Sequence, residues 1–324
     1  MNRYTRQIIL PEVGEAGQHI LRHARVLIVG AGGLGVPALQ YLVGAGVGHI
    51  TILDPDIVDE SNLHRQVLYR MNDIGHPKAV VAAQYMAQLN PDISVSGVTA
   101  LLTPNNASDL VQDCDLVLDC ADSFAVSYTL SDFCLAENTP LITASALMFS
   151  GYVAGTCGSA PSLRAIFPDL PAQSGNCATN GVAGPVVGTI GTLQAQMAFN
   201  HLLGIGTPLG QMLRYDAHSL RMASFRFDLA PEPTEIAFPF ISHLDITQDD
   251  FIVDLRAADE APIVHPNAQR RVVDDFADPN QTLTTHQRIV LVCRSGLRSW
   301  RAATLLQKHW HGNIALIAMG DIET

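Results

Sequence analysis

The sequence predicts an α/β protein with a mostly parallel sheet in its larger N-terminal part and a second, smaller α/β unit behind it. Three observations support this prediction. Apolar, β-prone runs at 26–29 and 49–53 are separated by a helix-like stretch, which is typical of parallel sheets. A proline-rich, acidic segment at 229–235 has the composition of a linker. A further β-prone run, 288–292, then leads through a loop into another helical pattern.

Composition narrows the class of protein. The 324 residues suffice for two domains, and 48% hydrophobic residues against 15% charged ones allow a large core. A net charge of −12 argues against unspecific nucleic-acid binding, which depends on Lys and Arg. The six cysteines form no C-x-x-C pair, so they indicate neither a disulfide framework nor a four-thiolate zinc site. The N-terminus has no signal-peptide pattern, and glycines interrupt the uncharged run 36–53, so we expect a cytoplasmic protein without a membrane span.

A glycine cluster lies between the strand-like run 26–29 and the helical pattern 36–44. Gly30, Gly32 and Gly35 have the G-x-G-x-x-G spacing of a Rossmann-like dinucleotide-binding unit. Glycine suits these positions because a Cβ would block the turn and keep the backbone away from a phosphate. Amides at the following helix start favour an anion. Similar glycines also occur in turns that bind nothing, so the motif alone does not decide.

Asp54 follows the second strand-like run, about 20 positions beyond the glycines. An acidic residue at this place can accept hydrogen bonds from ribose hydroxyls. The glycines and Asp54 together therefore predict a nucleotide site. A nicotinamide-dependent oxidoreductase shares both features and remains an alternative at this point.

The sequence after Asp54 contains charged side chains that binding of a redox nucleotide does not require. Arg65 lies in the polar segment Ser61–Gln66, and Lys78 opens the next helical stretch. Arg65 and Lys78 can together neutralise a polyphosphate, although either one alone also fits an ordinary solvated surface. Asp122 follows a later strand at the same sheet edge, where a carboxylate can hold Mg²⁺ against phosphate oxygens or simply cap a loop.

These motifs, in this order, resemble the MoeB/ThiF family of adenylyltransferases, which are similar to ubiquitin-activating enzymes. The resemblance covers roughly residues 1–228. It implies ATP-dependent adenylation of the C-terminal glycine of a ubiquitin-like sulfur-carrier protein of the molybdopterin or thiamine type. The segments that carry it are Arg3–Ile8, Gly30–Gly35, Ser61–Gln66, Lys78, Asp119–Asp122 and Gly184–Gly188.

The resemblance also assigns site residues. It implies that Asp122 holds Mg²⁺ and that Arg65 and Lys78 act on the phosphates. Arg6 is expected to reach into the site of a partner protomer, which implies a homodimer. The residues expected to line the ATP site are Gly33, Asp54, Ser61, Asn62, Leu63, His64, Arg65, Lys78, Asp122 and Ser123.

The chain departs from the family pattern in three places. Ser123 stands where the family usually has Asn, so one side-chain amide contact is lost. Ser162 and Ala165 occupy the positions of the first C-x-x-C pair of the family's structural zinc site, and no cysteine lies near 231–235. We therefore predict no zinc. The free energy of folding that zinc contributes elsewhere must then come from packing or from a dimer interface.

The remaining cysteines of this part are assigned by their surroundings. Cys177 lies in Asn176–Gly181, which matches a cysteine-bearing segment of the family. One hypothesis is that Cys177 attacks the acyl-adenylate or a persulfide-derived intermediate, and the alternative is a small loop residue without chemistry. Cys120 and Cys134 lie in apolar runs and are predicted to be core residues.

Cys293 lies between a β-prone strand and a helical pattern, in the segment Cys293–Ser299. Loop amides, the helix dipole and nearby arginines there all favour a thiolate. Cysteine-dependent phosphatases generally have C-x₅-R, whereas Arg298 follows Cys293 after only four residues, which suits a single terminal sulfur. The segment resembles a rhodanese domain, which implies that Cys293 carries a persulfide. It is short between Ala268 and Ile289, so helices of that domain are expected to be missing.

The two resemblances combine into one hypothesis. An ATP-binding adenylation domain (1–228) and a short rhodanese-like domain (241–324) are joined by a linker (229–240). The first activates the carrier terminus and the second supplies sulfur, received from a donor such as a cysteine desulfurase. A non-catalytic carrier-binding scaffold is the main alternative, because Ser123, the missing zinc cysteines and the short second domain depart from the patterns. The alternative of a nicotinamide-dependent oxidoreductase does not explain the presence of Arg65 and Lys78.

Overall fold

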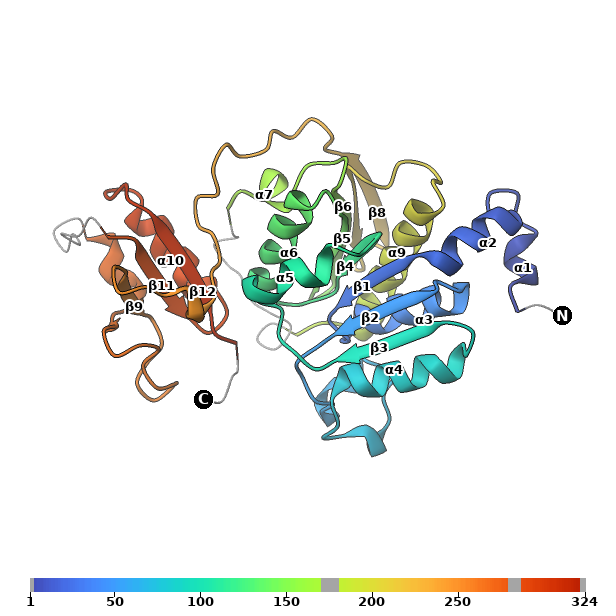
Figure 1. Cartoon of the computed structure of the whole chain (residues 1–324), viewed down its shortest axis with the longest axis horizontal. Coiled ribbons are helices and arrows are strands. Elements are labelled where there is room, and N and C mark those ends of the chain that lie inside the picture. The colour runs from blue at the N-terminus through green and yellow to red at the C-terminus, as the bar shows by residue number, and fades with distance from the viewer. Residues whose placement is uncertain (1–2, 170–180, 279–286, 321–324) are drawn as a thin grey trace.

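The computed structural model describes residues 3–169, 181–278 and 287–320. Within them the chain forms a mixed α/β fold with two sheets (Figure 1). The larger has eight strands in the order β3-β2-β1-β4-β5-β6-β7-β8, and the smaller has four in the order β10-β9-β11-β12. The prediction of a large, mainly parallel sheet followed by a smaller α/β unit is confirmed.

The larger sheet is parallel from β3 to β5 and antiparallel from β5 to β8. Its parallel half has the strand order of a nucleotide-binding α/β fold, in which ligands lie at the carboxyl ends of the strands. The strands are β1 (Arg25–Val29), β2 (His49–Leu53), β3 (Ser94–Val98), β4 (Leu116–Asp119), β5 (Pro140–Leu147), β6 (Ser150–Cys157), β7 (Gln211–Asp216) and β8 (Arg221–Arg226).

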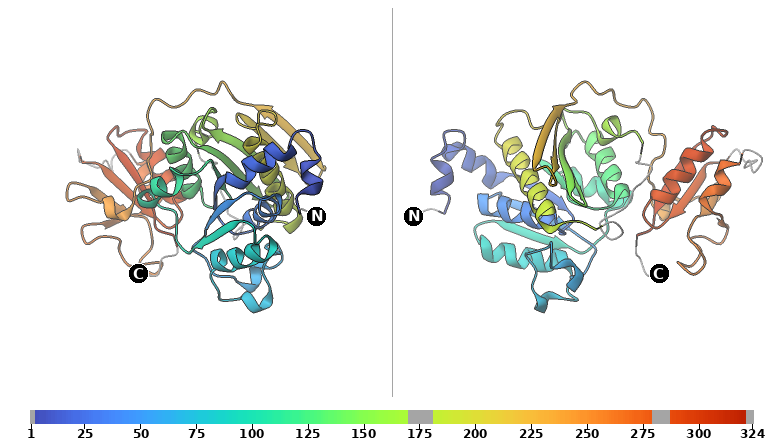
Figure 2. Two further views of the ribbon diagram at one scale, coloured as in Figure 1. Left: turned by 45° about the vertical axis from the view of Figure 1, so that its right-hand side comes forward. Right: turned by 180° about the vertical axis from the view of Figure 1, so that it is seen from behind.

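Helices cover both faces of this sheet (Figure 2). Val26 and Ile28 of β1 belong to the core beneath α3, α4 and α9, whereas Leu27 and Val29 belong to the core beneath α5 and α6. A strand covered on both faces is apolar throughout, which explains why this run shows no alternation. No helix in the described part of the chain is long and apolar enough to span a bilayer. The helices are α3 (Gly35–Ala45), α4 (Lys78–Leu89), α5 (Pro104–Val111), α6 (Phe124–Ala136) and α9 (Gly184–Leu202).

Two N-terminal helices, α1 (Thr5–Ile8) and α2 (Gly14–His23), precede the sheet. The Gln7 side chain donates to the carbonyl of Ala45, which ends α3 just before β2. These helices therefore lie at the amino ends of the parallel strands, away from the carboxyl ends that carry the predicted site. Figures 1 and 2 place them at the end of the molecule opposite the smaller sheet.

The smaller sheet is entirely parallel and consists of β9 (Phe251–Asp254), β10 (Gln269–Arg270), β11 (Ile289–Cys293) and β12 (Ile314–Ala318). Helix α10 (Leu297–Leu306) packs on one face of it. Before β11 the structure describes the 3₁₀ helix η4 (Val273–Ala277). Residues 279–286 lie outside the described ranges, so the expected absence of helices before β11 stays a prediction.

The segment between the two sheets arches over the top of the molecule in Figure 1. It contains no helix or strand from the end of β8 to Pro239. Leu316 of β12 then donates to the Pro239 carbonyl, and Ile241 donates to the Leu316 carbonyl, both over 2.9 Å. Residues 239–241 are thereby fixed to the free edge of the smaller sheet.

A buried glutamine ties the long helix α9 to the edge of the larger sheet. Gln194 is fully buried, and its Nε2 donates to the carbonyls of Asp119 (2.8 Å) and Ile142 (2.9 Å). Its Oε1 accepts from the Cys120 thiol. The helix is therefore bonded to the last residue of β4 and to Ile142 within β5, as well as packed on both strands.

We predict that Gln194→Ala lowers the free energy of unfolding by about 1–3 kcal/mol, because it leaves buried polar groups without a hydrogen-bond partner. Gln196 is the control, since it lies exposed on the same helix and bonds only to Asn200 there. Gln196→Ala is expected to stay within about 0.5 kcal/mol of the parent. Urea unfolding followed by circular dichroism measures both, and equal effects contradict the assignment.

Candidate active site

The candidate site lies where β1, β2 and β4 end. These strands are parallel and in register, with Val29 beside both Leu53 and Asp119. Figure 1 shows the three strands side by side. The glycine loop after β1, Asp54 after β2 and Asp122 after β4 consequently lie at one edge of the sheet, as the sequence predicted.

The glycine loop approaches the end of β4 too closely for any side chain. Gly30 has φ +99°, and a Cβ there would lie 2.6 Å from the Cys120 carbonyl oxygen. A Cβ on Gly35 would lie 1.9 Å from the Gly30 carbonyl oxygen. Both positions therefore require glycine.

Asp54 fixes this loop. Its Oδ2 accepts from the Ala31 amide over 2.7 Å and its Oδ1 from the Asp56 amide over 2.8 Å. Burial raises the pKa of Asp54, and the charge of Lys78 and these two amides offset only part of that effect. The carboxylate thus orders the phosphate-binding turn, a function in addition to the ribose contact that the sequence predicted.

Lys78 is buried at the start of α4, with 7% of its side chain exposed. Its Nζ lies 2.8 Å from Oδ2 of Asp56, whose own side chain is 63% exposed. The Tyr69 hydroxyl donates to the carbonyls of Ala31 (2.8 Å) and Lys78 (3.3 Å), so it links the glycine loop to this helix start. Burial raises the pKa of Tyr69, which keeps the hydroxyl protonated as a donor.

The polar segment Ser61–Gln66 packs against both the glycine loop and α9. It begins in the 3₁₀ helix η1 (Glu60–Asn62). Nη1 of Arg65 lies 3.0 Å from the Ser61 carbonyl oxygen and 2.8 Å from Nε2 of His64. A Cβ on Gly33 would lie 3.6 Å from Cγ of Arg65, so that side chain borders the loop.

Other members of this segment have different surroundings. Leu63 packs against the core beneath α3 and α9. Asn62 Nδ2 lies 3.4 Å from the Ser61 hydroxyl, which is bonded to Asp59. The structure thus brings Gly33, Asp54, Arg65 and Lys78 to one edge, with Ser61, Asn62 and His64 beside Arg65.

Three residues of this edge were not singled out from the sequence. Asp56 and Tyr69 carry no motif, and their contacts depend on the fold. Gln66 is 3% exposed, and its Oε1 is buried without a hydrogen-bond partner in the described structure. Its Nε2 would lie 3.5 Å from a Cβ on Gly32. Its place in Ser61–Gln66 was the signal for Gln66 that the sequence offered.

Asp119 is the last residue of β4, and Asp122 follows it three residues later; their two carboxylates have different environments. Asp119 is fully buried and accepts from the Thr143 hydroxyl (2.8 Å) and the Ala121 amide (3.2 Å). Burial raises its pKa to about 6, and hydrogen bonds offset part of this effect. Asp122 is exposed and makes no hydrogen bond or ion pair with any residue in the described ranges.

The Asp122 environment fits the predicted magnesium ligand. Mg²⁺ typically takes one or two carboxylates together with substrate phosphate oxygens. Asp122 offers an exposed carboxylate one residue beyond Ala121, whose backbone nitrogen lies 3.0 Å from the Cβ position of Gly30. Ser123 next to it precedes α6 without capping it through its side chain.

A second set of reactive side chains lies at the carboxyl end of β11. Cys293 Sγ accepts from the Gly296 amide over 3.1 Å and from the Ser299 amide over 3.4 Å. The Ser299 hydroxyl donates to the Gly296 carbonyl and lies 3.4 Å from the sulfur. Two amides thus bond to the sulfur of Cys293 itself, and the thiol is closed to solvent.

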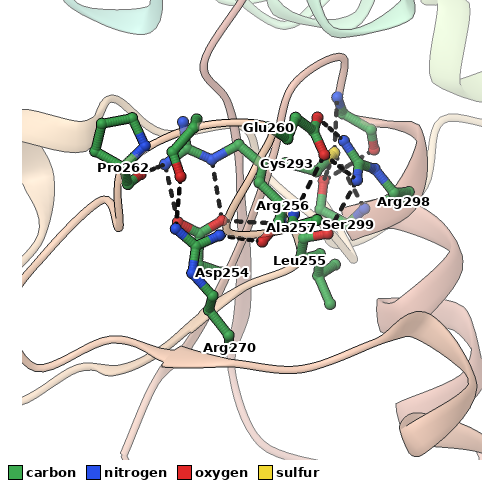
Figure 3. A network of polar contacts seen from close by, with 12 residues as sticks. Asp254, Leu255, Arg256, Ala257, Glu260, Pro262, Arg270, Cys293, Arg298 and Ser299 are labelled. Carbon is green, nitrogen blue, oxygen red and sulfur yellow. Dashed lines mark hydrogen bonds and ion pairs between the residues drawn. The ribbon is translucent and has the colours of Figure 1, made fainter.

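Ion pairs hold the surroundings of Cys293 (Figure 3). Arg298 pairs with Glu260 and donates to the Leu255 carbonyl. The hydrogen bond that Arg298 donates to the Glu260 carboxylate lowers the pKa of Glu260. Burial raises the pKa of Asp254, but bonds from Arg256 and two amides outweigh it, so the net shift is downward. Arg298 is thus held beside the loop by a neighbouring carboxylate.

The structure separates some predicted residues from the site. Arg6 lies exposed on α1, at the amino ends of the strands, and does not reach the glycine loop of its own chain. Cys177 lies outside the described residues. Cys120 and Cys134 are buried, at 5% and 0% exposure, which confirms them as core residues.

The two segments that the sequence associated with zinc contact each other directly. Glu232 accepts from the Ser162 amide over 2.5 Å and from the Ser162 hydroxyl over 2.7 Å. The same serine caps α7 (Leu163–Ile166). Among the described residues, no group of three or more His, Cys, Asp or Glu side chains is placed to hold a metal. The absence of zinc remains a prediction. In the structure, the hydrogen bonds between Ser162 and Glu232 join the two segments.

A protein-family model matches the part of the chain that carries this site. The model described as ThiF family matches residues 4–235, which includes every group of the larger sheet edge described above. The chain belongs to the ThiF family. This match confirms the resemblance stated for the N-terminal part of the sequence.

Similar proteins carry names of two kinds. The Escherichia coli protein named sulfur carrier protein ThiS adenylyltransferase is 45% identical over 224 residues, which cover 68% of this chain and 89% of that protein. A Yarrowia lipolytica protein named adenylyltransferase and sulfurtransferase UBA4 is 45% identical over 206 residues, covering 63% of this chain and 52% of that protein. The second match lies in the N-terminal part of this ThiF-family chain.

Solved structures confirm the fold of the larger part. A crystal structure of Escherichia coli MccB with MccA-N7isoAsn superimposes with a TM-score of 0.65 at 21% identity. The superposition covers 72% of this chain and 74% of that one. At this identity the likeness concerns the fold alone.

The raised pKa of Asp119 gives a testable dependence on pH. Its folded pKa of about 6 exceeds the reference value of 3.8, so between these values the folded chain binds a proton that the unfolded chain has lost. The carboxyl therefore favours folding fully below pH 3.8, and this contribution falls by about 3 kcal/mol as pH rises to 6 and above. We predict that the Tm of Asp119→Asn minus the parent Tm is more positive at pH 8 than at pH 4. Asp109→Asn, at an exposed aspartate on α5, is the control, and a difference independent of pH contradicts the assignment.

Proposed function

We propose that this protein adenylates the C-terminal glycine of a ubiquitin-like sulfur-carrier protein with ATP and then transfers sulfur from a Cys293 persulfide to form a thiocarboxylate. The observation that carries the first part is the meeting of the glycine loop, Arg65, Lys78 and an unpaired Asp122 at one sheet edge in a ThiF-family chain. The adenylyltransferase names of its relatives support the same reading.

The first step is attack of the carrier carboxylate on the α-phosphorus of ATP. A carboxylate oxygen forms a bond to phosphorus, and the bond to the leaving pyrophosphate breaks. Negative charge gathers at the phosphates, so positioning and charge stabilisation supply most of the catalysis. Arg65 and Lys78 provide the cations, and glycine-loop amides provide donors. Mg²⁺, when bound at Asp122, neutralises phosphate charge.

Sulfur transfer then uses the acyl-adenylate as an electrophile. The outer sulfur of a Cys293 persulfide bonds to the carbonyl carbon and AMP leaves, which gives an acyl disulfide. Attack by the Cys177 thiolate on the Cys293 sulfur releases the carrier thiocarboxylate and leaves a Cys177–Cys293 disulfide, which a thiol reductant must reopen. The amides that bond to Cys293 Sγ favour its thiolate, and the sulfurtransferase name of the UBA4 relative supports this part of the proposal.

The proposal includes partners and assembly. A donor such as a cysteine desulfurase supplies the persulfide sulfur, and the carrier is of the molybdopterin or thiamine type. Arg6 lies far from the site of its own chain, which is compatible with its proposed place in the site of a second protomer of a homodimer. ThiF-family membership of residues 4–235 and the separate smaller sheet support the proposed domains at 1–228 and 241–324.

We predict that Asp122→Asn lowers carrier-dependent ATP–pyrophosphate exchange about 100-fold or more, because it removes the carboxylate proposed to hold Mg²⁺. Asp113→Asn, at an exposed aspartate beyond α5, is the control and is expected to keep parental exchange. A panel of purified carriers provides the substrates. Carrier binding without exchange in the parent identifies a scaffold instead, and NADH binding without ATP binding identifies an oxidoreductase.

We predict that Cys293→Ser retains ATP–pyrophosphate exchange and abolishes thiocarboxylate formation. Mass spectrometry of the intact carrier, after incubation with ATP, Mg²⁺ and a sulfur donor, measures the product. Cys114→Ser is the matched control, since Cys114 is a half-buried thiol bonded to the Leu110 carbonyl on α5. A normal thiocarboxylate yield from Cys293→Ser refutes the role of this cysteine.

A further inference from the structure

One hydrophobic core joins the two sheet units. Residues of α6 and α7 in the larger unit pack with the segment before β9 and with α10 in the smaller one. Figure 1 shows α6 and α7 on the side of the larger unit that faces the smaller one. The buried members that make this junction include Ala125, Tyr128, Leu163, Phe238, Phe240 and Trp300.

Arg164 is the polar centre of this junction. It is 6% exposed, and its Nε and Nη2 bond to the two carboxylate oxygens of Asp132 over 2.6 and 2.9 Å. The guanidinium carbon lies 5.0 Å from the Tyr128 ring centre and 5.7 Å from the Trp300 ring centre. Nη2 also lies 3.4 Å from the Phe238 carbonyl oxygen. One buried cation therefore contacts both units and the segment that connects them.

Trp300 provides the opposite half of the contact. It is 4% exposed on α10, whose first residue comes directly after the Cys293 loop. Its ring centre lies 5.1 Å from that of Tyr128 and 5.4 Å from that of Phe238, the latter edge-on at 83°. Because α10 continues from the loop, the position of Trp300 sets the position of the loop.

The Cys293 loop is pressed against the larger unit. Gly296 has φ +86°, and a Cβ there would lie 2.9 Å from the Phe240 ring and 3.2 Å from the Ala125 side chain. Ala125 lies in the first turn of α6, just after Asp122 and Ser123. A cavity of about 90 Å³ between the units is lined by Ser123 and by Arg294, the residue after Cys293.

We propose that Arg164 and Trp300 form a latch that holds the smaller unit docked with the Cys293 loop against the start of α6. In this docked form the latch closes the Cys293 sulfur to molecules in solution, and the loop lies beside the edge that carries Asp122. Arg164 is a positioning residue in this arrangement. The importance of the latch for sulfur delivery rests on the proposed function, because loading of Cys293 by an external donor then requires the latch to open.

Site-resolved alkylation tests the latch without ATP, carrier or donor, so its outcome is independent of the proposed function. The full-length protein is treated with iodoacetamide, and digestion with mass spectrometry gives the rate at each cysteine. We expect Arg164→Ala to alkylate Cys293 at least ten times faster than the parent. Arg164→Lys, which retains a charge for Asp132, is expected to fall between the two. Arg301→Ala, at an exposed arginine on α10, is expected to match the parent.

Cys134 and Cys157 are internal references, because both are fully buried in the larger unit and report its unfolding. Their rates should remain at the parental level while that of Cys293 rises. Should Arg164→Ala expose these references too, Asp132→Asn, which weakens the hold on Arg164 but keeps its guanidinium, is expected to accelerate Cys293 alone. An unchanged Cys293 rate in Arg164→Ala or Asp132→Asn, or acceleration only together with Cys134, overturns the latch.

Discussion

The near-contact between the turn after β1 and the end of β4 is the constraint around which the larger unit is built. A Cβ on Gly30 would collide with the Cys120 carbonyl, so the two backbone segments touch without any side chain between them. Asp54 then fixes the turn by accepting from the Ala31 amide. The sheet itself thus positions the amides of the glycine loop, so a ligand that binds them would not have to order the turn, which lowers the cost of binding.

Charge at this edge is arranged asymmetrically. The buried Lys78 has a carboxylate partner in Asp56. Among the described residues, the Arg65 guanidinium hydrogen-bonds to a carbonyl and an imidazole but to no carboxylate, and Asp122 has no hydrogen-bond or ion-pair partner. Of the two side chains that lack an opposite charge, Arg65 borders the glycine loop and Asp122 follows the end of β4. The proposed ligand, a polyphosphate with a divalent cation, would supply both missing charges at once.

Much of this edge was predictable from the sequence because continuous apolar strands and obligatory glycines leave local signals. The run 26–29, the glycine spacing and Asp54 all fall where expected. Tyr69 and Asp56 were missed because their roles arise from contacts between distant segments, which no local pattern records. The same holds for Arg164, whose partners Asp132 and Trp300 meet it only through packing of α6, α7 and α10. The burial of Cys120 and Cys134 was predictable from their apolar neighbours.

The connection between the two sheets has a kinetic consequence. A short segment links the end of β8 to Pro239, and Pro239–Ile241 is bonded to β12. In the proposed undocked form, the smaller unit therefore stays tethered to the larger one. Short flexible tethers impose local concentrations of about millimolar order. Re-docking is therefore an intramolecular event whose rate does not depend on how many copies of the protein a cell contains. Dilution slows every encounter with a separate carrier or donor but leaves the meeting of the two halves unaffected.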